Sequence, residues 1–570
     1  MAYYINERCV SCQKCKVECP VGAITLGADR PVIDEERCIC CGTCASICNL
    51  GAAVDLAAPA VEVRLHPLIE KSCDLVVLGG GGTGLVAAAR AAWLGVKKII
   101  VLEKNVKTGG GAWFAADFKV FQSRWQRERG IPDVLEKSLN EAMDQTYWKL
   151  DPHLAERCYR ATGAFFDWLC ESGTQVADQF QTGFYIFDGP SGPSIPVFQK
   201  MRHGKQGGTG KFVMDQMLEL CRKHGVEVRT ETAADELIVE QGRIRGVMAS
   251  DAGGRLKINC KACILATGSW INNQSVLTRV APQFASFYTC RSAHRSPMYT
   301  GDGIRLAEQA GAFIDYDNFC LRLMGPLTMA ADGTPYRTFA SMSADPSVIY
   351  VNQEGKRWIN EEAPGRVGFF HTAETMLRQP GGISYTIFDT NCIKRAVQAS
   401  VNGEHPSFGA FPLPGFPEDW ETDLDKAVRE YAPWVKKADT LEELAQELGL
   451  SERNLKETVE RYNRLCEQRK DEDFFKNQKY LVPLIEGPYY GAICNMATDG
   501  AFGGVKVNAR MEVLDLEGKP IHNFYAGGDF TSSRYINQGG VKIQIINDLA
   551  WAFASGYLAA ESAAEDLKLE

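Results

Sequence analysis

A pattern of apolar runs broken by glycines between residues 75 and 103 predicts a strand, a tight turn, a helix and a second strand. Leu75–Leu78 is an uninterrupted apolar run of the kind that buried strands show. After a glycine-rich turn, a helical stretch continues to about Leu94. The apolar run Ile99–Leu102 predicts the second strand, and Glu103 follows it directly. This order is typical of a nucleotide-binding βαβ unit, so we expect an α/β fold with a Rossmann-like domain.

The turn itself carries the spacing G-x-G-x-x-G, from Gly79 through Gly81 to Gly84. Glycines there allow a tight turn and a close approach of the backbone to a pyrophosphate, which the helix N-terminus attracts. Glu103 lies 19 residues after Gly84, where it can accept from a ribose hydroxyl. The chain carries this fingerprint once, which favours FAD over a second, NAD-type site. The predicted ligands of FAD in this unit are Gly79, Gly81, Gly82, Thr83, Gly84, Glu103 and Lys104.

The first 48 residues hold nine of the 20 cysteines, and eight of these nine fall into two runs of C-x2-C-x2-C-x3-C. This is the spacing of bacterial ferredoxins with two [4Fe–4S] clusters, in which the fourth cysteine of each run ligates the other cluster. A pair of zinc knuckles would not use eight cysteines at this rhythm. Cys40 fits no ligand position. The first cluster is assigned to Cys9, Cys12, Cys15 and Cys48, and the second to Cys38, Cys41, Cys44 and Cys19.

Composition narrows the class of protein. The chain has 570 residues and a net charge of −9, so we expect several domains and neither a nucleic-acid footprint nor a basic membrane patch. It opens MAYYINERC, directly before the first cluster motif, and its most apolar stretch is the nucleotide-binding turn. No membrane span and a cytoplasmic location are therefore expected. The cysteines outside the clusters are interpreted as reduced, mostly buried thiols.

Further short motifs resemble the flavoprotein family of fumarate reductases and succinate dehydrogenases, which also includes urocanate reductase and 3-ketosteroid dehydrogenases. They follow the family order over roughly residues 72 to 565. The motifs are Thr108–Gly111 (TGGG), Gly207–Gly210 (GGTG), Ala262–Gly268 (ACILATG), Thr300–Gly303 (TGDG), Gly355–Glu361 (GKRWINE), Lys437–Leu444 (KADTLEEL) and Asn523–Asp529 (NFYAGGD). The resemblance adds FAD contacts at Gly109, Gly110, Gly111, Ala266, Thr267, Gly268, Asp302, Gly528, Asp529, Gly539 and Gly540.

The resemblance also implies the domain organisation. A Rossmann-like FAD-binding domain in two parts, residues 72–315 and 491–570, would enclose an inserted α+β cap at 316–490. The small ferredoxin-like domain with two [4Fe–4S] clusters would occupy residues 1–60. Substrate is expected between the cap and the flavin ring.

In the reductases of this family, flavin N5 gives a hydride to the β-carbon of a polarised C=C bond, and a cap arginine protonates the α-carbon. The arginine nearest to the matching position is Arg366, five residues after Glu361, one more than usual in the family. Arg534 and Tyr535 lie in the segment expected at the flavin and are candidate catalytic residues. Tyr535 could donate a proton or polarise a carbonyl group, as tyrosines do in the ketosteroid members. The alternative is that Tyr535 packs against the ring and Arg534 contacts a phosphate or solvent. Asn537 falls where fumarate reductases carry a substrate-binding arginine. The apolar segment Phe319–Met329 suggests a larger, less charged substrate than fumarate.

The leading functional hypothesis is an FAD- and iron–sulfur-dependent oxidoreductase that reduces an enoate or enone. Electrons would reach FAD through both clusters from an external low-potential donor such as a ferredoxin or flavodoxin, as in anaerobic metabolism. Two alternatives stay open: a dehydrogenase running the reverse reaction, and an electron-transfer subunit without an organic substrate. The partners expected are thus a small unsaturated molecule and a redox protein, with no nucleic acid.

Overall fold

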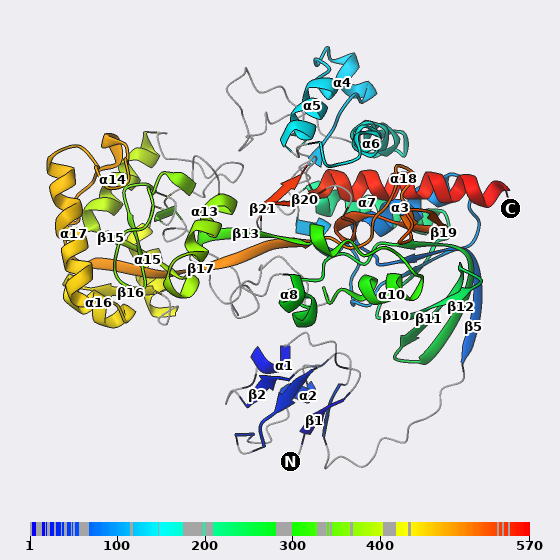
Figure 1. Ribbon diagram of the computed structural model, residues 1–570, viewed down its shortest axis with the longest axis horizontal. Helices are drawn as coiled ribbons and strands as arrows, with labels where there is room; N and C mark the ends of the chain where they lie inside the picture. Colours follow the sequence, from blue (N-terminus) through cyan, green and yellow to red (C-terminus); the bar gives the residue numbers. More distant parts are fainter. Residues whose placement is uncertain are drawn as a thin grey trace.

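The protein is described by a computed structural model (Figure 1). The structure describes residues 3–6, 9, 14–17, 19, 23–27, 30–35, 37–38, 43–46, 48, 52–55, 68–114, 118–145, 148–174, 198–199, 209–280, 299–327, 338, 341–342, 345–364, 369–402, 416, 418–430, 435–532, 535–538, 541–544 and 548–569.

The N-terminal part is a small unit with an internal repeat. Its two antiparallel ribbons pair β1 (Tyr3–Ile5) with β4 (Ala53–Asp55) and β2 (Ile24–Leu26) with β3 (Pro31–Ile33). Each cysteine run contains a one-turn helix. Helix α1 (Lys14–Val17) follows β1 in the chain, and α2 (Thr43–Ser46) follows β3. The core of this unit consists of a few aliphatic side chains packed together with cysteines of both runs. It is too small to be held by apolar burial alone, which is typical of domains stabilised by metal ligands.

The largest sheet has eight strands and contains the nucleotide-binding unit. Its main path runs β10 (Ala233–Glu240), β11 (Arg243–Asp251), β12 (Gly254–Leu265), β5 (Ile69–Leu78), β6 (Ile99–Leu102) and β9 (Glu227–Arg229). From β12 to β9 neighbouring strands are parallel. The C-terminal strand β19 (Pro520–Ala526) joins in parallel beside β12 and pairs with β18 (Glu512–Leu514). Segments more than 250 residues apart in sequence therefore form one sheet.

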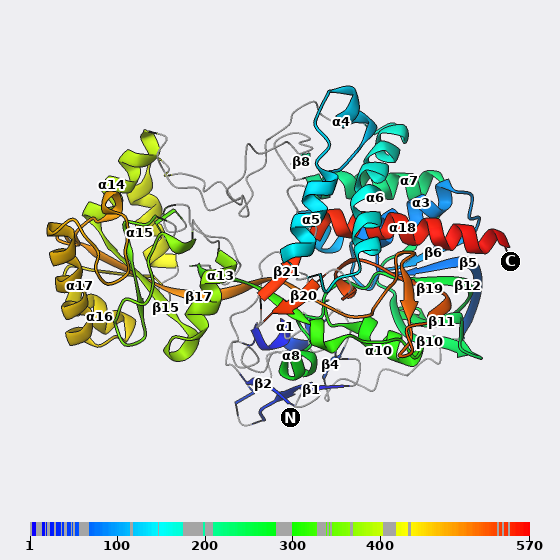
Figure 2. The ribbon, with the colours of Figure 1, turned by 45° about the horizontal axis from the view of Figure 1, so that its top comes forward.

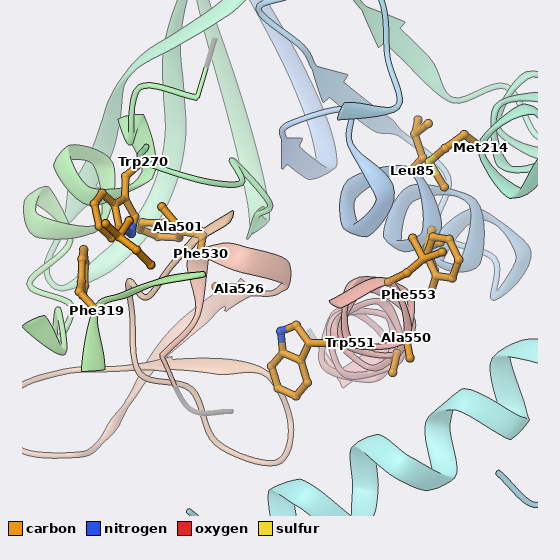
Figure 3. Packing of buried hydrophobic residues seen from close by; sticks show 14 of the residues in the cluster. Leu85, Met214, Trp270, Phe319, Ala501, Ala526, Phe530, Ala550, Trp551 and Phe553 are labelled. Atoms are coloured by element: carbon orange, nitrogen blue, oxygen red, sulfur yellow. The ribbon is translucent and has the colours of Figure 1, made fainter. Parts of the chain in front are cut away.

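Helices cover this sheet, with the C-terminal helix α18 (Asp548–Leu569) lying along α3 (Gly82–Trp93) and α6 (Pro152–Glu171) (Figures 1 and 2). Figure 3 shows Phe553 of α18 directed at Leu85 of α3, with Met214 of α7 (Thr209–Lys223) on the other side of Leu85. A Cβ on Gly556 would lie 2.4 Å from the carbonyl oxygen of Thr83. The two helices can approach this closely only because position 556 has no side chain.

The βαβ prediction agrees with the structure for the helix, which ends at Trp93, and for the second strand, Ile99–Leu102. The first strand is longer than predicted and begins at Ile69. Its first half is solvent-exposed and polar, yet it pairs with β12 from Leu256 onward. Apolar periodicity detects only the buried half of such a strand, and the ladder continues beyond the core.

The remaining part of the chain forms a second body around a five-stranded sheet of β13 (Cys320–Leu327), β17 (Tyr489–Phe502), β15 (Ser384–Asp389), β14 (Ile349–Asn352) and β16 (Val435–Ala438). Its helices are α13 (Phe369–Leu377), α14 (Thr390–Val401), α15 (Trp420–Glu430), α16 (Leu441–Leu448) and α17 (Glu452–Glu467). Strand β17 has 14 residues: its first part pairs with β15, and its second part pairs with β13. In both views β17 (orange) runs from the group α14–α17 toward the large sheet (Figures 1 and 2).

The remaining described elements belong to neither of the two large sheets. They are η1 (Gly110–Phe114), β7 (Phe118–Lys119), α4 (Arg124–Glu128), α5 (Leu135–Gln145), β8 (Phe198–Gln199), α8 (Gln274–Val280), α10 (Asp302–Gln309), η2 (Tyr316–Asn318), η3 (Pro380–Gly382), η4 (Gln478–Tyr480), η5 (Gly528–Phe530), β20 (Tyr535–Gln538) and β21 (Val541–Gln544). None of the helices that the structure describes combines the length and apolar character that crossing a membrane requires.

A buried cluster of four charges holds the second body together. Arg357 donates to Glu361 at 2.8 Å and to Asp471 at 3.0 Å, and Lys476 lies 3.2 Å from Glu361. The side chains of Glu361, Asp471 and Lys476 have no exposed surface. Lys476 also donates to the carbonyl oxygen of Val348 at 2.8 Å. The cluster therefore ties the end of the GKRWINE motif to the loop after α17 with two cations and two anions.

The charges keep Glu361 ionised although it is buried. Burial alone would raise the pKa of its carboxyl group, but Lys476 and Arg357 together hold this pKa below its ordinary value of 4.5. A carboxylate whose pKa is lower in the folded than in the unfolded state stabilises the fold above the unfolded pKa. That stabilisation is lost as the pH falls through the folded pKa.

We expect Glu361→Gln to lower the free energy of unfolding of this body by about 3 kcal/mol or more at neutral pH, because Lys476 is left buried without its carboxylate. The difference from the wild type should shrink as the pH falls below 4.5. Hydrogen exchange of peptides covering β14 in a urea series would measure it. Glu442→Gln, which removes an exposed partner of Lys456, is the matched control and should change nothing measurable. Equal effects of the two variants would contradict the role of the cluster.

Candidate functional site

The turn between β5 and α3 is built from glycines that admit no side chain, with one exception. A Cβ on Gly84 would lie 1.8 Å from the carbonyl oxygen of Gly79, and a Cβ on Gly79, whose φ is +109°, would lie 2.2 Å from that of Ala266. Gly81 differs, because nothing lies within 4 Å of its Cβ position. Its φ of −81° is also accessible to any residue. The Cβ position of Gly81 therefore faces open space, whereas the Cβ positions of the other glycines of this turn are occupied by neighbouring atoms.

Helix α3 begins directly at this space. Gly81 is its N-cap residue and provides no side-chain hydrogen bond to the first-turn N–H groups. Such N–H groups, together with the positive end of the helix dipole, attract anions and in particular phosphates. The turn thus offers an open, electropositive face.

Glu103 stands at the end of β6, beside the same turn. Its carboxylate accepts from the backbone N–H of Gly80 at 2.9 Å and of Asn105 at 2.8 Å. Burial raises the pKa of Glu103 above its ordinary value, and these two N–H donors oppose the shift. The next residue, Lys104, places its Nζ 2.5 Å from both Asp302 Oδ2 and Thr300 Oγ1. Two backbone N–H groups therefore hold the carboxylate of Glu103, which is predicted to contact the ribose. Lys104 binds the TGDG motif through Thr300 and Asp302.

Three distant segments close around the turn. Gly109 donates its N–H to the carbonyl oxygen of Gly80 at 2.8 Å. Ala266 donates to the carbonyl oxygen of Leu78 at 2.8 Å, where β12 ends beside β5. A Cβ on Gly528 would lie 2.4 Å from Thr83 Oγ1, so the C-terminal segment packs directly on the start of α3. The described members of the predicted FAD set thus come together from six parts of the chain.

The residues present fit a dinucleotide cofactor. Gly81 leaves room for one, the start of α3 offers uncapped N–H groups, and Glu103 offers acceptor oxygens. Thr267 adds a further polar group: its Oγ1 is buried and has no hydrogen-bond partner within the described part of the chain. A buried hydroxyl without a partner is costly, so a ligand that supplies one is expected here. Gly111 lies in η1, and Asp529 lies in η5.

The cysteine runs show the same backbone bonding twice. Cys19 Sγ accepts from Ala23 N at 3.3 Å, and Cys48 Sγ accepts from Ala52 N at 3.2 Å. Hydrogen bonds of this kind stabilise thiolate ligands and tune cluster potentials. Cys9, Cys15, Cys38 and Cys44 are also described, and Cys12 and Cys41 lie outside the described residues. Among the residues that the structure describes, no group of three or more potential ligands is close enough to hold a metal ion.

The cysteines of the other domains agree with the interpretation as buried thiols. None of those described is part of a disulfide among the described residues, and most are buried. Burial, with the nearby charge of Asp74, raises the pKa of Cys73 to about 12. A thiol of this kind stays protonated at physiological pH and does not act as a nucleophile.

Of the predicted catalytic residues, Arg366 and Arg534 lie outside the described residues, as do the flavin contacts Gly539 and Gly540. Tyr535 opens β20 opposite Gln544, but its side chain is outside the described part. The inference of a larger substrate from Phe319–Met329 stays a prediction, because most side chains of this segment lie outside the described residues; its first residue, Phe319, is described. Its ring is 1% exposed and stacks on Trp270, with 5.2 Å between the ring centroids (Figure 3), so it belongs to the core.

Sequence reasoning missed two residues of the site. The first is Tyr299, which directly precedes the TGDG motif. Its side chain reaches two of the predicted flavin-contacting turns. Trp551 was also missed: its Nε1 donates to the carbonyl oxygen of Gly528 at 3.0 Å. No local signal marks either residue, because both act through contacts with segments far away in the sequence.

Comparison with known proteins assigns the chain to protein families. Residues 74–540 match the FAD binding domain family, and residues 2–25 match the 4Fe-4S binding domain family. The chain is 28% identical to a vinyl phenol reductase of Lactiplantibacillus plantarum, over 80% of this chain and 90% of that protein. It is 27% identical to an NADH:fumarate oxidoreductase of Klebsiella pneumoniae, over 80% of this chain and 44% of that longer protein.

The fold is also found among solved structures. The open conformation of a flavocytochrome c3 fumarate reductase matches with a TM-score of 0.64 and 22% identity, over 87% of this chain and 79% of that one. The predicted fold class, a Rossmann-like FAD-binding α/β fold preceded by a ferredoxin-like segment, is therefore confirmed.

We expect Gly81→Ala to fold normally but to weaken FAD binding by about tenfold or more, because the added methyl group enters the space over the turn. Titration of the apoprotein with FAD, followed by quenching of flavin fluorescence, measures the affinity, and a thermal melt of the apoprotein measures the fold. Gly84→Ala is the contrasting variant and should destabilise the apoprotein itself, since its Cβ would overlap Gly79. Unchanged FAD affinity in Gly81→Ala would refute a cofactor over this turn.

Proposed function

The chain belongs to the FAD binding domain family that includes the fumarate reductase flavoproteins, and we propose that it is an iron–sulfur flavoenzyme that reduces an activated C=C bond. The observation that carries the proposal is one chain combining the open glycine turn for FAD, an iron–sulfur segment and a large inserted body. The relatives described above are named as reductases of vinyl phenol and of fumarate, and each of these compounds contains a C=C bond.

FAD, when bound and reduced, supplies a hydride for the carbon at one end of the double bond. The chain must supply a proton to the other end and hold the activating group. Arg366 is proposed as the proton donor, as the resemblance implies. Arg534 and Tyr535 are proposed to hold or polarise the activating carboxylate or carbonyl group. Glu361, which is fixed in the buried charge cluster, lies five residues before Arg366 and anchors the chain that leads to it.

The residue set favours a substrate with one activating group. A second carboxylate would require a second cation, and Asn537 offers a neutral amide where fumarate reductases carry arginine. An amide can hydrogen-bond a carbonyl or phenol oxygen, but it does not neutralise a carboxylate. Monocarboxylic enoates, enones and vinyl aromatics are therefore proposed ahead of fumarate.

Two [4Fe–4S] clusters are proposed to deliver electrons, from an external low-potential donor such as a ferredoxin or flavodoxin, to the flavin. Clusters carry one electron at a time, whereas hydride transfer uses two, so a relay beside a two-electron carrier is physically reasonable. A low-potential donor pushes electrons toward the flavin and the substrate, so substrate reduction is proposed ahead of the reverse reaction, which a dehydrogenase would catalyse. A pure electron-transfer subunit is disfavoured, because the body built on β14–β17 provides a lid that a relay does not need.

The function is tested by anaerobic photoreduction of the purified protein, followed by the addition of acrylates, cinnamates, urocanate, fumarate, enones and vinyl phenols. We expect rapid flavin reoxidation by one class with a single activating group. The flavin of Arg366→Ala should reoxidise at least about a hundredfold more slowly, the lower end of the contribution of a general acid. The exposed Arg378→Ala should behave as wild type. If no compound reoxidises an intact flavin, the electron-transfer-subunit hypothesis is favoured instead.

The relay is tested separately with the double variant Cys12→Ala, Cys41→Ala, which removes one proposed ligand from each cluster. We expect reduction of FAD by a ferredoxin to fall to background, whereas FAD reduced directly by dithionite still reacts with substrate. Cys40→Ala is the matched control, since Cys40 fits no ligand position, and it should keep both activities and the cluster absorbance. Full ferredoxin-driven turnover in the double variant would exclude the relay.

A further inference from the structure

Tyr299 stands between two of the turns that surround the cofactor space. Its side chain is largely buried, with 9% exposed. A Cβ on Gly268 would lie 3.3 Å from Tyr299 Cε1, so the ring covers the turn after β12. A Cβ on Gly110 would lie 3.5 Å from the Tyr299 hydroxyl oxygen. The ring therefore lies against one turn, and the hydroxyl group lies against the other.

The hydroxyl end lies near the dinucleotide turn, with Gly110 next to both. Gly110 is in contact with Gly81, since its Cβ position lies 3.3 Å from Gly81 Cα. Gly81 and Gly109 are bridged in parallel. Gly81 is also the position over which nothing lies within 4 Å. A phenol hydroxyl can donate a hydrogen bond, and an anion bound over Gly81 and the start of α3 would be within its neighbourhood.

The segment that carries Tyr299 is held firmly in place. The carbonyl oxygen of Tyr299 accepts from Asn272 N at 2.9 Å, and that of Thr300 accepts from Asn273 Nδ2 at 2.9 Å. Lys104 binds Thr300 and Asp302 from the other side, directly after the ribose-directed Glu103. The position of the tyrosine is therefore set by the same strand end that carries the acid of the site.

From this geometry we propose that Tyr299 is a cofactor-binding residue that donates a hydrogen bond from its hydroxyl to the pyrophosphate of FAD. The Lys104–Asp302 pair acts as the positioning contact. Nothing in the family motifs assigns this residue, and the proposal does not depend on which substrate the enzyme reduces. The competing explanation is that Tyr299 only fills space between the two turns. The two explanations differ in one atom, because packing requires the ring and donation requires the hydroxyl oxygen.

The experiment compares apoproteins of the wild type and Tyr299→Phe, which keeps the ring. Titration with FAD, read by quenching of flavin fluorescence, should show about tenfold weaker binding or more, as expected for loss of a hydrogen bond to a charged acceptor. Tyr316→Phe is the matched control: Tyr316 is partly exposed, its hydroxyl donates to Glu308 at 3.1 Å, and its loss should leave FAD affinity unchanged. A Tyr299→Phe affinity within twofold of the wild type overturns the proposal.

ADP serves as a second probe, because it carries the pyrophosphate without the flavin. Competition of ADP against FAD should weaken in Tyr299→Phe by the same factor as FAD binding. If only FAD binding weakens, the hydroxyl acts on the flavin half and the pyrophosphate assignment is wrong. A thermal melt of each apoprotein guards against misfolding. Should Tyr299→Phe melt early, the titration is repeated at a temperature at which both apoproteins stay folded, and an affinity within twofold of the wild type there overturns the proposal.

Discussion

Close contact between backbones at the start of α3 is the constraint on which the rest of the structure depends. Gly79 meets the end of β12, Gly84 meets Gly79, and Gly528 meets Thr83, all at distances that exclude a side chain. These contacts bring residues from opposite ends of the chain into one wall. Of the glycines at this turn, only Gly81 has open space at its Cβ position, and this is where the cofactor is expected. The large sheet and helix α18 contact this turn or helix α3 directly, and the TGDG segment is bound by Lys104 beside it.

Sequence reasoning succeeded where the chemistry is local. A phosphate-binding turn needs its glycines, its helix and its acid within about 30 residues, so βαβ order could be read directly. The ferredoxin-type spacing is local in the same sense. Sequence reasoning failed where a residue's structure or role depends on contacts with residues far away in the sequence. The polar half of β5 is a strand only because β12 lies beside it, and Tyr299 matters only because Gly110 and Gly268 approach it. Phe319 itself lies in the core, and its sequence neighbourhood could not distinguish a core position from a ligand pocket.

The two larger bodies are stabilised by different physical means. The nucleotide-binding body relies on small residues and helix packing, with Ala-rich α3 buried beneath α18. The second body contains, besides its apolar core, the charges of Arg357, Glu361, Asp471 and Lys476, whose mutual attraction offsets a large desolvation cost. Charges buried this way favour one arrangement over near alternatives, which suits the segment that leads to the proposed proton donor.

Strand β17 belongs to the ladders of both β15 and β13, and this has a mechanical consequence. Within the described residues, β13 and β17 form the antiparallel ribbon on which the second body is carried (Figure 1). A hydrogen-bonded ribbon resists sliding but yields to torsion. Its ladder is irregular at two places, between Arg322 and Leu323 and between Met324 and Leu327. Irregularities of this kind increase local twist. Any reorientation of the second body about this ribbon would therefore be torsional, and its stiffness would depend on the register of these two strands.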